Sequence, residues 1–269
     1  MNKVKKLNIL VFGGTGFLGF NLVKSLIKEK HNVRVFSRGN IKPLETLENV
    51  NYIVGDISNN LDLKEAIKDI DFVYHFASTT NPKIGENDLF FDLSTNLAPT
   101  INILNQCVEN NIKKFIFCSS GGTVYGNHDI MPISENFACN PISSYGLVKH
   151  SIEMYIKYFS RRYNLNYEIL RVSNPYGYGQ FPSGSQGVIP IFIKKILHNI
   201  EIQVFGDGTS VRDYIYIDDF IDLSLKLLTI NQKNNTMNIA SGKAISINDL
   251  IRKIEFQIDK TAKIKYLPK

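Results

Sequence analysis

Cysteine is scarce in this chain, and no long hydrophobic run is present. The three cysteines, Cys107, Cys118 and Cys139, form no CxxC pair, and the five histidines show no metal-ligand spacing. Neither a disulfide framework nor a metal site is therefore predicted. Lys, Asp or Asn interrupts every apolar stretch before the ~18 residues that a membrane helix needs. The short apolar run near the N-terminus leads into glycines rather than into a signal-peptide cleavage site, so we expect a cytoplasmic protein.

Acidic residues are fewer than basic ones, 25 against 31, which gives a formal net charge of +6. A basic balance can mark binding to nucleic acid, to a membrane surface or to an anionic small substrate. No Lys/Arg cluster alternates with aromatic residues as a nucleic-acid groove would require. We therefore expect no nucleic-acid or membrane partner. An apolar fraction of 43% in 269 residues is enough to form a sizeable core.

Short β-branched runs alternate with segments whose apolar residues have helical spacing, a pattern typical of βαβ units with a parallel sheet. The predicted strands are Leu7–Phe12, Val33–Phe36, Val50–Val54, Phe72–Phe76, Lys114–Cys118 and Tyr167–Arg171. The predicted helices are Gly16–Lys30, Leu61–Lys68, Ser94–Glu109 and Ser144–Tyr163. After Arg171, loops rich in Gly, Pro and Ser take over. The sequence therefore predicts an α/β fold, with a doubly wound parallel sheet over residues 1–172 and a small C-terminal substrate-binding lobe over residues 173–269.

Three glycines, Gly13, Gly16 and Gly19, follow the first predicted strand and open the first predicted helix. Residues without a Cβ let backbone N–H groups approach a pyrophosphate, and the helix N-terminus adds partial positive charge. Between a strand and a helix, this spacing is the fingerprint of the Rossmann dinucleotide-binding fold. We predict that these glycines, with Phe17 and Leu18, bind a dinucleotide cofactor.

The second predicted strand ends without the acidic residue that normally accepts the ribose hydroxyls of NAD. Ser37 and Arg38 stand there instead, and a guanidinium suits the 2′-phosphate of NADP. Alternatively, Arg38 is a surface cation and NAD binds without that residue. The predicted cofactor is therefore NAD or NADP, with NADP slightly favoured. Asp56 is placed to meet the adenine end, and the segment Phe76-Ala77-Ser78 is placed beside the pyrophosphate and ribose.

Tyr145 and Lys149 lie four residues apart near the start of the predicted helix Ser144–Tyr163, so they share one helical face. A phenol with a pKa near ~10 is a poor base at neutral pH, and a nearby ammonium favours its phenolate. Such a pair can take a proton from a sugar hydroxyl while a hydride passes to a nicotinamide. We therefore predict that both residues are catalytic.

Five motifs occur along the chain in the following order: the glycine turn, Asp56, FCSSGGTVYG at 117–126, the Tyr145/Lys149 pair and SNPYG at 173–177. Together they resemble the extended short-chain dehydrogenase/reductase family, and within it the nucleotide-sugar enzymes of the UDP-glucose 4-epimerase type. A later segment, GDG at 206–208 followed by VRDYI at 211–215, is similar to the family's segment in which an arginine binds the nucleotide's diphosphate. The resemblance covers essentially the whole chain.

At the cofactor, the resemblance implies that Tyr145 is the acid/base and that Lys149 also holds the nicotinamide ribose. The further residues that it implies at the cofactor are Ile57, Asn96, Ser119 and Pro175.

At the substrate, a nucleotide-diphosphate sugar, the resemblance implies that Asn174 bridges cofactor and sugar and that Arg212 holds the diphosphate. The residues that it implies at the border of the nucleotide are Val188 and Phe205. By its chemistry a bidentate guanidinium suits phosphate oxygens, but Arg212 could also form a surface ion pair with Asp213 or Asp218.

Gly121 stands where many relatives have a catalytic Ser or Thr, four residues before the tyrosine of the VYG segment. A glycine has no side chain to hydrogen-bond a sugar hydroxyl, so Ser120, Thr123 or neither takes that role. Thr123 is favoured because it lies two residues further along an extended backbone and points the same way. Val124 and Tyr125 follow it and supply neither the acid nor the base that sugar dehydration needs, so dehydration is not expected.

The function that the sequence favours is an NAD(P)-dependent nucleotide-sugar 4-epimerase that acts through a transient 4-keto sugar. One alternative is an NADPH-dependent nucleotide 4-keto-6-deoxysugar reductase, which Ser37 and Arg38 would suit. A second alternative is a non-catalytic dinucleotide-binding protein. It is favoured by the short C-terminus, because the sequence stops at Lys269, before the final segment that relatives have. By family analogy and from the apolar Met154 and Tyr158, we expect a homodimer in which the helix that carries Tyr145 and its neighbouring helix Ser94–Glu109 form a four-helix contact with the partner.

Overall fold

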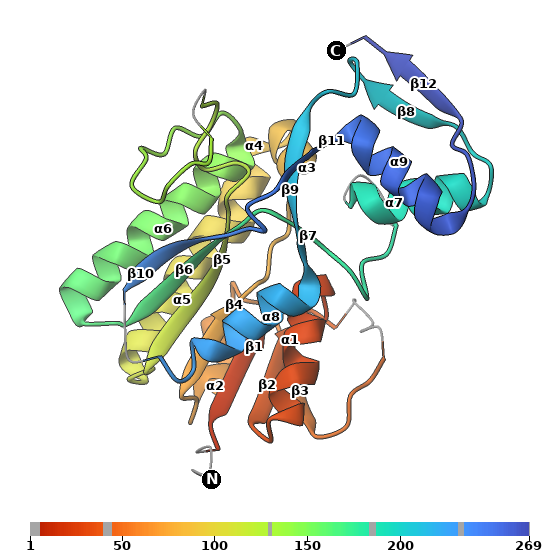
Figure 1. Cartoon of the computed structure of the whole chain (residues 1–269). Helices are drawn as coiled ribbons and strands as arrows, with labels where there is room; N and C mark the ends of the chain where they lie inside the picture. Colours follow the sequence, from red (N-terminus) through yellow and green to blue (C-terminus); the bar gives the residue numbers. More distant parts are fainter. Residues whose placement is uncertain (1–5, 40–44, 129–130, 183–186, 231–233, 269) are drawn as a thin grey trace. The chain divides into compact units, whose positions relative to one another are not determined.

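The computed structural model describes residues 6–39, 45–128, 131–182, 187–230 and 234–268 (Figure 1). The chain divides into two compact units. The first runs to Val172 and also contains Asp218–Ile239, and the second consists of Ser173–Ile217 and the residues from Ala240 onward. No helix in the described ranges is both long and apolar enough to cross a bilayer.

The first unit is built on a seven-stranded sheet in the order β10-β6-β5-β4-β1-β2-β3 (Figure 1). Every neighbouring pair is parallel, which confirms the predicted fold class. The strands are β1 Asn8–Phe12, β2 Asn32–Ser37, β3 Val50–Val54, β4 Phe72–His75, β5 Lys114–Ser120, β6 Tyr167–Val172 and β10 Asn235–Ile239. The middle strands are buried on both faces, as their nearly continuous apolar sequences require.

Helices cover both faces of this sheet. They are α1 Phe17–Lys28, α2 Asn60–Ile67, α3 Pro82–Asn87, α4 Leu89–Asp92, η1 Leu93–Leu97, α5 Ala98–Glu109, α6 Ser144–Tyr163 and α8 Ile217–Lys226. On one face, α2, α5 and α6 pack into a core with Leu10, Phe115 and Phe117. On the other, α8 is tied to the sheet, because the Tyr74 hydroxyl donates to the Ser224 carbonyl at 2.7 Å.

The helix predicted over Ser94–Glu109 is two elements in the structure. Its first turn belongs to the π-helix η1, and the α-helical pattern resumes only at Ala98. Pro99, which has no N–H to donate to the preceding turn, stands at this change. The helix Ser144–Tyr163 has the predicted bounds.

The C-terminal lobe differs from the prediction of residues 173–269, because Asp218–Ile239 return to the first unit. β10 pairs in parallel with β6 and completes the edge of the sheet. The buried Lys114 Nζ, on β5, donates to the carbonyls of Leu227 at 2.8 Å and Ile230 at 3.2 Å, which follow α8. β10 was not predicted, because its sequence NTMNI has too few apolar residues for the pattern of a buried strand.

The second unit contains two small sheets. β7 Asn174–Tyr176, β9 Val211–Tyr216 and β11 Ala244–Ser246 form one, in the order β11-β9-β7, and β8 Ile202–Phe205 pairs with β12 Ile264–Leu267 to form the other. The helices α7 Val188–Leu197 and α9 Ile247–Ile258 complete the unit. Its core joins the two helices to β8.

Candidate functional site

The glycine turn packs closely against the end of β4 and against its own backbone at the start of α1. Gly13 has a φ of 81°, and a Cβ there would lie 2.7 Å from the Ala77 nitrogen; a Cβ on Gly19 would collide with the carbonyl oxygen of Gly13. Gly16, the N-cap, supplies no side-chain hydrogen bond to the first turn of the helix. The turn therefore presents uncapped N–H groups at the positive end of the helix, an arrangement that fits the pyrophosphate of a dinucleotide.

The residues predicted at the cofactor's adenosine end lie at the ends of neighbouring strands. Ser37 is the last residue of β2, and Arg38 follows it with an exposed side chain. Asp56 follows β3 and is also exposed, and its Oδ1 accepts the Ser58 N–H at 2.8 Å. Ile57 packs against the core. Parallel strands bring their carboxyl ends to one sheet edge, so these residues lie at the same edge as the glycine turn.

The Tyr145/Lys149 pair lies at the start of α6, against β5. Lys149 is buried, and its Nζ donates to the Cys118 carbonyl at 2.9 Å. The same nitrogen lies 5.6 Å from the centroid of the Tyr145 ring and 4.7 Å from that of Phe117. The ammonium is thus held beside the phenol by the strand, as the helical spacing predicts, and contacts the face of its ring.

The expected lowering of the Tyr145 pKa does not occur in this structure. Burial raises the pKa of the Tyr145 phenol, and Cys118 and Asp92 raise it further, while the Ser78 hydroxyl opposes them. Burial also lowers the pKa of Lys149. The prediction of a favoured phenolate left out this desolvation, which penalises the charged form of both groups.

A buried carboxylate close to Tyr145 was not predicted. Asp92 is fully buried, and its Oδ2 accepts the Ser144 hydroxyl at 2.9 Å. Its Oδ1 accepts the Thr80 hydroxyl at 2.6 Å and the Asn96 amide at 3.1 Å. This network fixes the first turn of α6 against η1. The one trace of it in the sequence is that Asp92 and Asn96 lie four residues apart.

Two residues expected at the cofactor use their side chains internally. The Asn96 amide donates to Asp92 and Thr80, and its Oδ1 accepts the Thr79 N–H at 3.0 Å. The Ser119 hydroxyl donates to the buried Glu153. The family resemblance implied cofactor contacts for Asn96 and Ser119 but not these internal hydrogen bonds. Any contact that the two residues make with a cofactor stays a prediction.

Two hydroxyl groups, those of Thr123 and Ser120, are candidates for the role that a Ser or Thr at position 121 has in many relatives. A Cβ on Gly121 would lie 3.0 Å from the Arg171 carbonyl oxygen, so the strand leaves little room for a side chain there. Thr123 Oγ1 is buried with no hydrogen-bond partner among the described residues, and Ser120 is the half-buried last residue of β5. An unpartnered buried hydroxyl is costly, which favours Thr123 as a group that meets a ligand.

The residues predicted at the substrate belong to the second unit. Asn174 Nδ2 donates to the Asp213 carbonyl at 2.8 Å, and the neighbouring Pro175 lies opposite Ile215 in the same pair of strands. Val188 begins α7, and Phe205, at the end of β8, is 68% exposed.

Arg212 is exposed on β9, and its Nη1 donates to the Val211 carbonyl at 2.7 Å. The alternative of an ion pair with Asp213 is not found, because that carboxylate accepts hydrogen bonds from Ser173, Ser241 and the Lys243 N–H instead.

Comparison with known proteins agrees with this geometry. The model of the NAD dependent epimerase/dehydratase family matches residues 9–240. A putative UDP-glucose 4-epimerase of Methanocaldococcus jannaschii is 40% identical over 256 residues, which cover 93% of this chain and 82% of that protein. A dTDP-4-dehydro-6-deoxyglucose reductase of Escherichia coli is 35% identical over 271 residues, which cover 97% and 85%. The solved structure of the UDP-glucose 4-epimerase of Thermotoga maritima with UDP-glucose superposes with a TM-score of 0.92 at 33% identity, covering 97% of this chain and 86% of that one.

The chain therefore belongs to the NAD-dependent epimerase/dehydratase family, a family of enzymes. The predicted resemblance to the extended short-chain dehydrogenases is confirmed, and the non-catalytic alternative loses its support.

Proposed function

We propose that this enzyme is a 4-epimerase of a nucleotide-diphosphate sugar and that it works through a 4-keto intermediate. The observation that carries the proposal is the half-buried Tyr145, held beside Lys149 at the carboxyl end of β5, on the sheet whose first strand leads into the glycine turn. When bound, the nicotinamide would accept a hydride from C4 of the sugar and return it to the opposite face.

Tyr145 Oη would move the proton in both half-reactions. It takes the proton of the 4-hydroxyl as the sugar is oxidised and gives it back as the 4-keto group is reduced. Burial raises the pKa of the phenol, so Tyr145 rests protonated and must first release its proton to solvent. The Lys149 ammonium, 5.6 Å from the ring centroid, would stabilise the phenolate, which then takes the proton of the 4-hydroxyl. Thr123 or Ser120 would orient the reacting oxygen with a hydrogen bond.

In the second unit, Arg212 would hold the diphosphate. Its guanidinium is exposed on β9 and not paired with Asp213, so its remaining donors can face phosphate oxygens. Val188 and Phe205 would contact the nucleotide, and Asn174 would bridge cofactor and sugar. A cytoplasmic location stays a prediction.

A reductase of a 4-keto-6-deoxysugar nucleotide is the second candidate, supported by the similarity to the E. coli reductase and by Arg38 after β2. Release of the cofactor from the purified protein by denaturation separates the two. Tightly retained NAD and interconversion of UDP-glucose and UDP-galactose would support the epimerase. A protein that is purified empty, binds NADPH and shows no interconversion would overturn the epimerase in favour of the reductase.

Arg38 is expected to set the choice between NADP and NAD. Facing a 2′-phosphate of about two negative charges, a guanidinium makes charge-assisted hydrogen bonds worth about 1.5–3 kcal/mol. Arg38→Ala should therefore weaken NADPH binding about ten- to a hundredfold and leave NADH binding nearly unchanged. Ser37→Asp should reverse the preference by accepting the ribose hydroxyls. Calorimetry that shows an equal loss for both cofactors would make Arg38 a surface cation only.

We also propose a homodimer through α6 and its neighbours. Leu147, Met154 and Tyr158, spaced seven and four residues apart, form one exposed apolar stripe on α6, with exposures of 56%, 47% and 47%. Phe90 on α4 and Leu93 on η1, elements that pack against α6, are also exposed. Such a stripe is typical of a covered interface.

The double variant Met154→Lys/Tyr158→Lys should therefore sediment as a monomer at micromolar concentration, where the wild type sediments as a dimer. Phe256→Lys, at the exposed apolar residue of α9, serves as the control and should remain dimeric. A monomeric wild type would refute the interface.

A further inference from the structure

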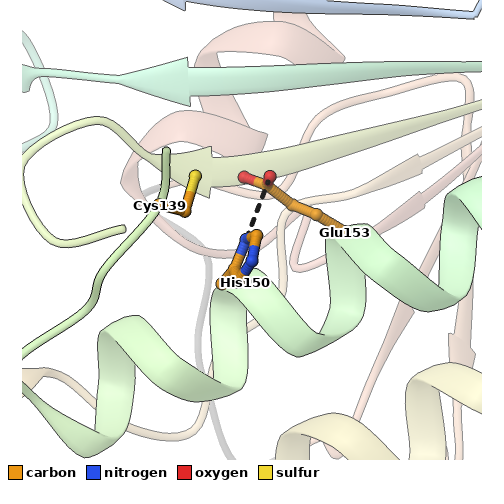
Figure 2. Close-up of side chains that lie close together, drawn as sticks. All are labelled: Cys139, His150 and Glu153. Carbon is orange, nitrogen blue, oxygen red and sulfur yellow. Dashed lines mark ion pairs between the residues drawn. The ribbon is translucent and has the colours of Figure 1, made fainter. Parts of the chain in front are cut away.

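Three side chains with metal-binding atoms converge beside α6. Cys139 comes from the segment between β5 and α6, and His150 and Glu153 lie one turn apart on the helix (Figure 2). One ligand atom from each lies within 4.8 Å of the other two. The epimerase chemistry proposed above uses none of these three side chains, so the cluster needs an explanation of its own.

The carboxylate of Glu153 is fixed by hydrogen bonds from Ser119 and Arg171. It is fully buried, and its Oε1 accepts the Ser119 hydroxyl and Arg171 Nε. Its Oε2 accepts Arg171 Nη2 at 2.6 Å, and this same oxygen faces His150 Nδ1. A carboxylate oxygen has two acceptor positions, so Oε2 can accept one further bond besides that from Arg171.

His150 is not satisfied by this pair. Its Nδ1 lies 3.7 Å from Glu153 Oε2, too far for a hydrogen bond, and has no hydrogen-bond partner among the described residues although it is buried. Figure 2 shows the imidazole of His150 and the carboxylate of Glu153 facing each other, with the thiol of Cys139 beside them. An ion between the three would give the orphaned nitrogen a partner.

The Cys139 thiol completes the donor set. It is half-buried, and burial raises its pKa; Glu153 also raises it, and the opposing positive charges of Arg171 and Lys157 do not outweigh them, so the thiol is the resting form. Thiolate, imidazole and carboxylate are together the ligands of zinc-class ions, which take three protein ligands where a fourth position stays open to solvent. Hydrogen bonds from Arg171 and Ser119 to the Glu153 carboxylate would orient it toward the ion.

We propose that Cys139 Sγ, His150 Nδ1 and Glu153 Oε2 form a binding site for one divalent transition-metal ion of the zinc class. The ion forms a bond with the Cys139 sulfur, and the thiol proton is released to solvent. Because the metal competes with this proton, its affinity rises with pH until the thiol is ionised. The bound ion links the segment before α6 to the helix that carries Tyr145.

Titration of the full-length protein with Co²⁺ tests the site without reference to activity. The expected result is one equivalent of bound cobalt with a thiolate-to-cobalt charge-transfer band, because Cys107 and Cys118 are buried away from solvent. Cys139→Ser should abolish the band, and His150→Ala should weaken cobalt binding more than about tenfold. Both positions are half-buried, so the variants should fold, which circular dichroism checks.

His198→Ala is the matched control, because His198 is exposed and its Nδ1 lies 2.8 Å from the Lys194 carbonyl oxygen, on the same helical turn. It should bind cobalt as the wild type does. Zn²⁺ should displace the cobalt and remove the band. The proposal is overturned if the wild type shows no charge-transfer band, or if the folded variants at Cys139 and His150 bind cobalt with unchanged affinity.

Discussion

Tyr145→Phe should reduce turnover about 10²- to 10⁴-fold while leaving cofactor affinity nearly unchanged. The phenylalanine keeps the ring that Lys149 contacts and loses only the hydroxyl that moves the proton. Steady-state kinetics with a nucleotide sugar and calorimetry with the cofactor measure the two effects separately.

Tyr155→Phe is the control for this experiment, because Tyr155 is on the same helix with 40% of its surface exposed. It should have wild-type kinetics. Wild-type turnover in Tyr145→Phe would remove the phenol from the mechanism. A parallel loss of cofactor affinity would instead assign Tyr145 to cofactor binding.

Glu153→Gln should destabilise the first unit by about 3–5 kcal/mol, because it leaves the buried Arg171 without its counter-charge. In the wild type the guanidinium forms a two-pronged pair, from Nε at 3.1 Å and from Nη2 at 2.6 Å. Glu45→Gln makes the same chemical change in an exposed ion pair with Lys24 and should change the stability little. Urea unfolding measures both variants, and equal small effects would contradict the prediction.

The same pair predicts how stability depends on pH. Burial alone would raise the pKa of Glu153, but His150, Arg171 and Ser119 outweigh it and lower the pKa to about 2. The unfolded chain binds this proton at higher pH than the folded chain does. The stabilisation is therefore complete above the unfolded value of 4.5 and is lost as the pH falls from there toward about 2. Glu153→Gln should lack this contribution in acid unfolding curves.

The parallel sheet and the glycine turn could be predicted because local patterns specify them. β4 and β5 are continuous apolar runs, and the turn needs glycines where a Cβ would meet Ala77 or Gly13. The bounds of α6 follow from a capping serine, Ser143, and from Asn164, which ends the helix with a positive φ of 56°.

The parts that escaped prediction depend on contacts between distant residues. β10 is a strand because β6 offers it an edge, not because its own sequence favours one. Asp92 and Glu153 are buried carboxylates, and most of their partners are distant in the sequence, so the residues around them give little sign of a network. The pKa of Tyr145 depends on desolvation, which only the packed helix reveals.

The return of the chain to the first unit has a consequence for its synthesis. A nascent chain that has reached Val172 has β6 as the open edge of its sheet, and Lys114 lacks the carbonyls of Leu227 and Ile230. An unpaired edge strand is a template for aggregation, and the pairing that covers it spans 67 residues, from Glu168 to Asn235. The ribosome must therefore translate most of the second unit before the first is complete, and a gene fragment cut at residue 172 would encode a sheet that ends at β6 instead of β10.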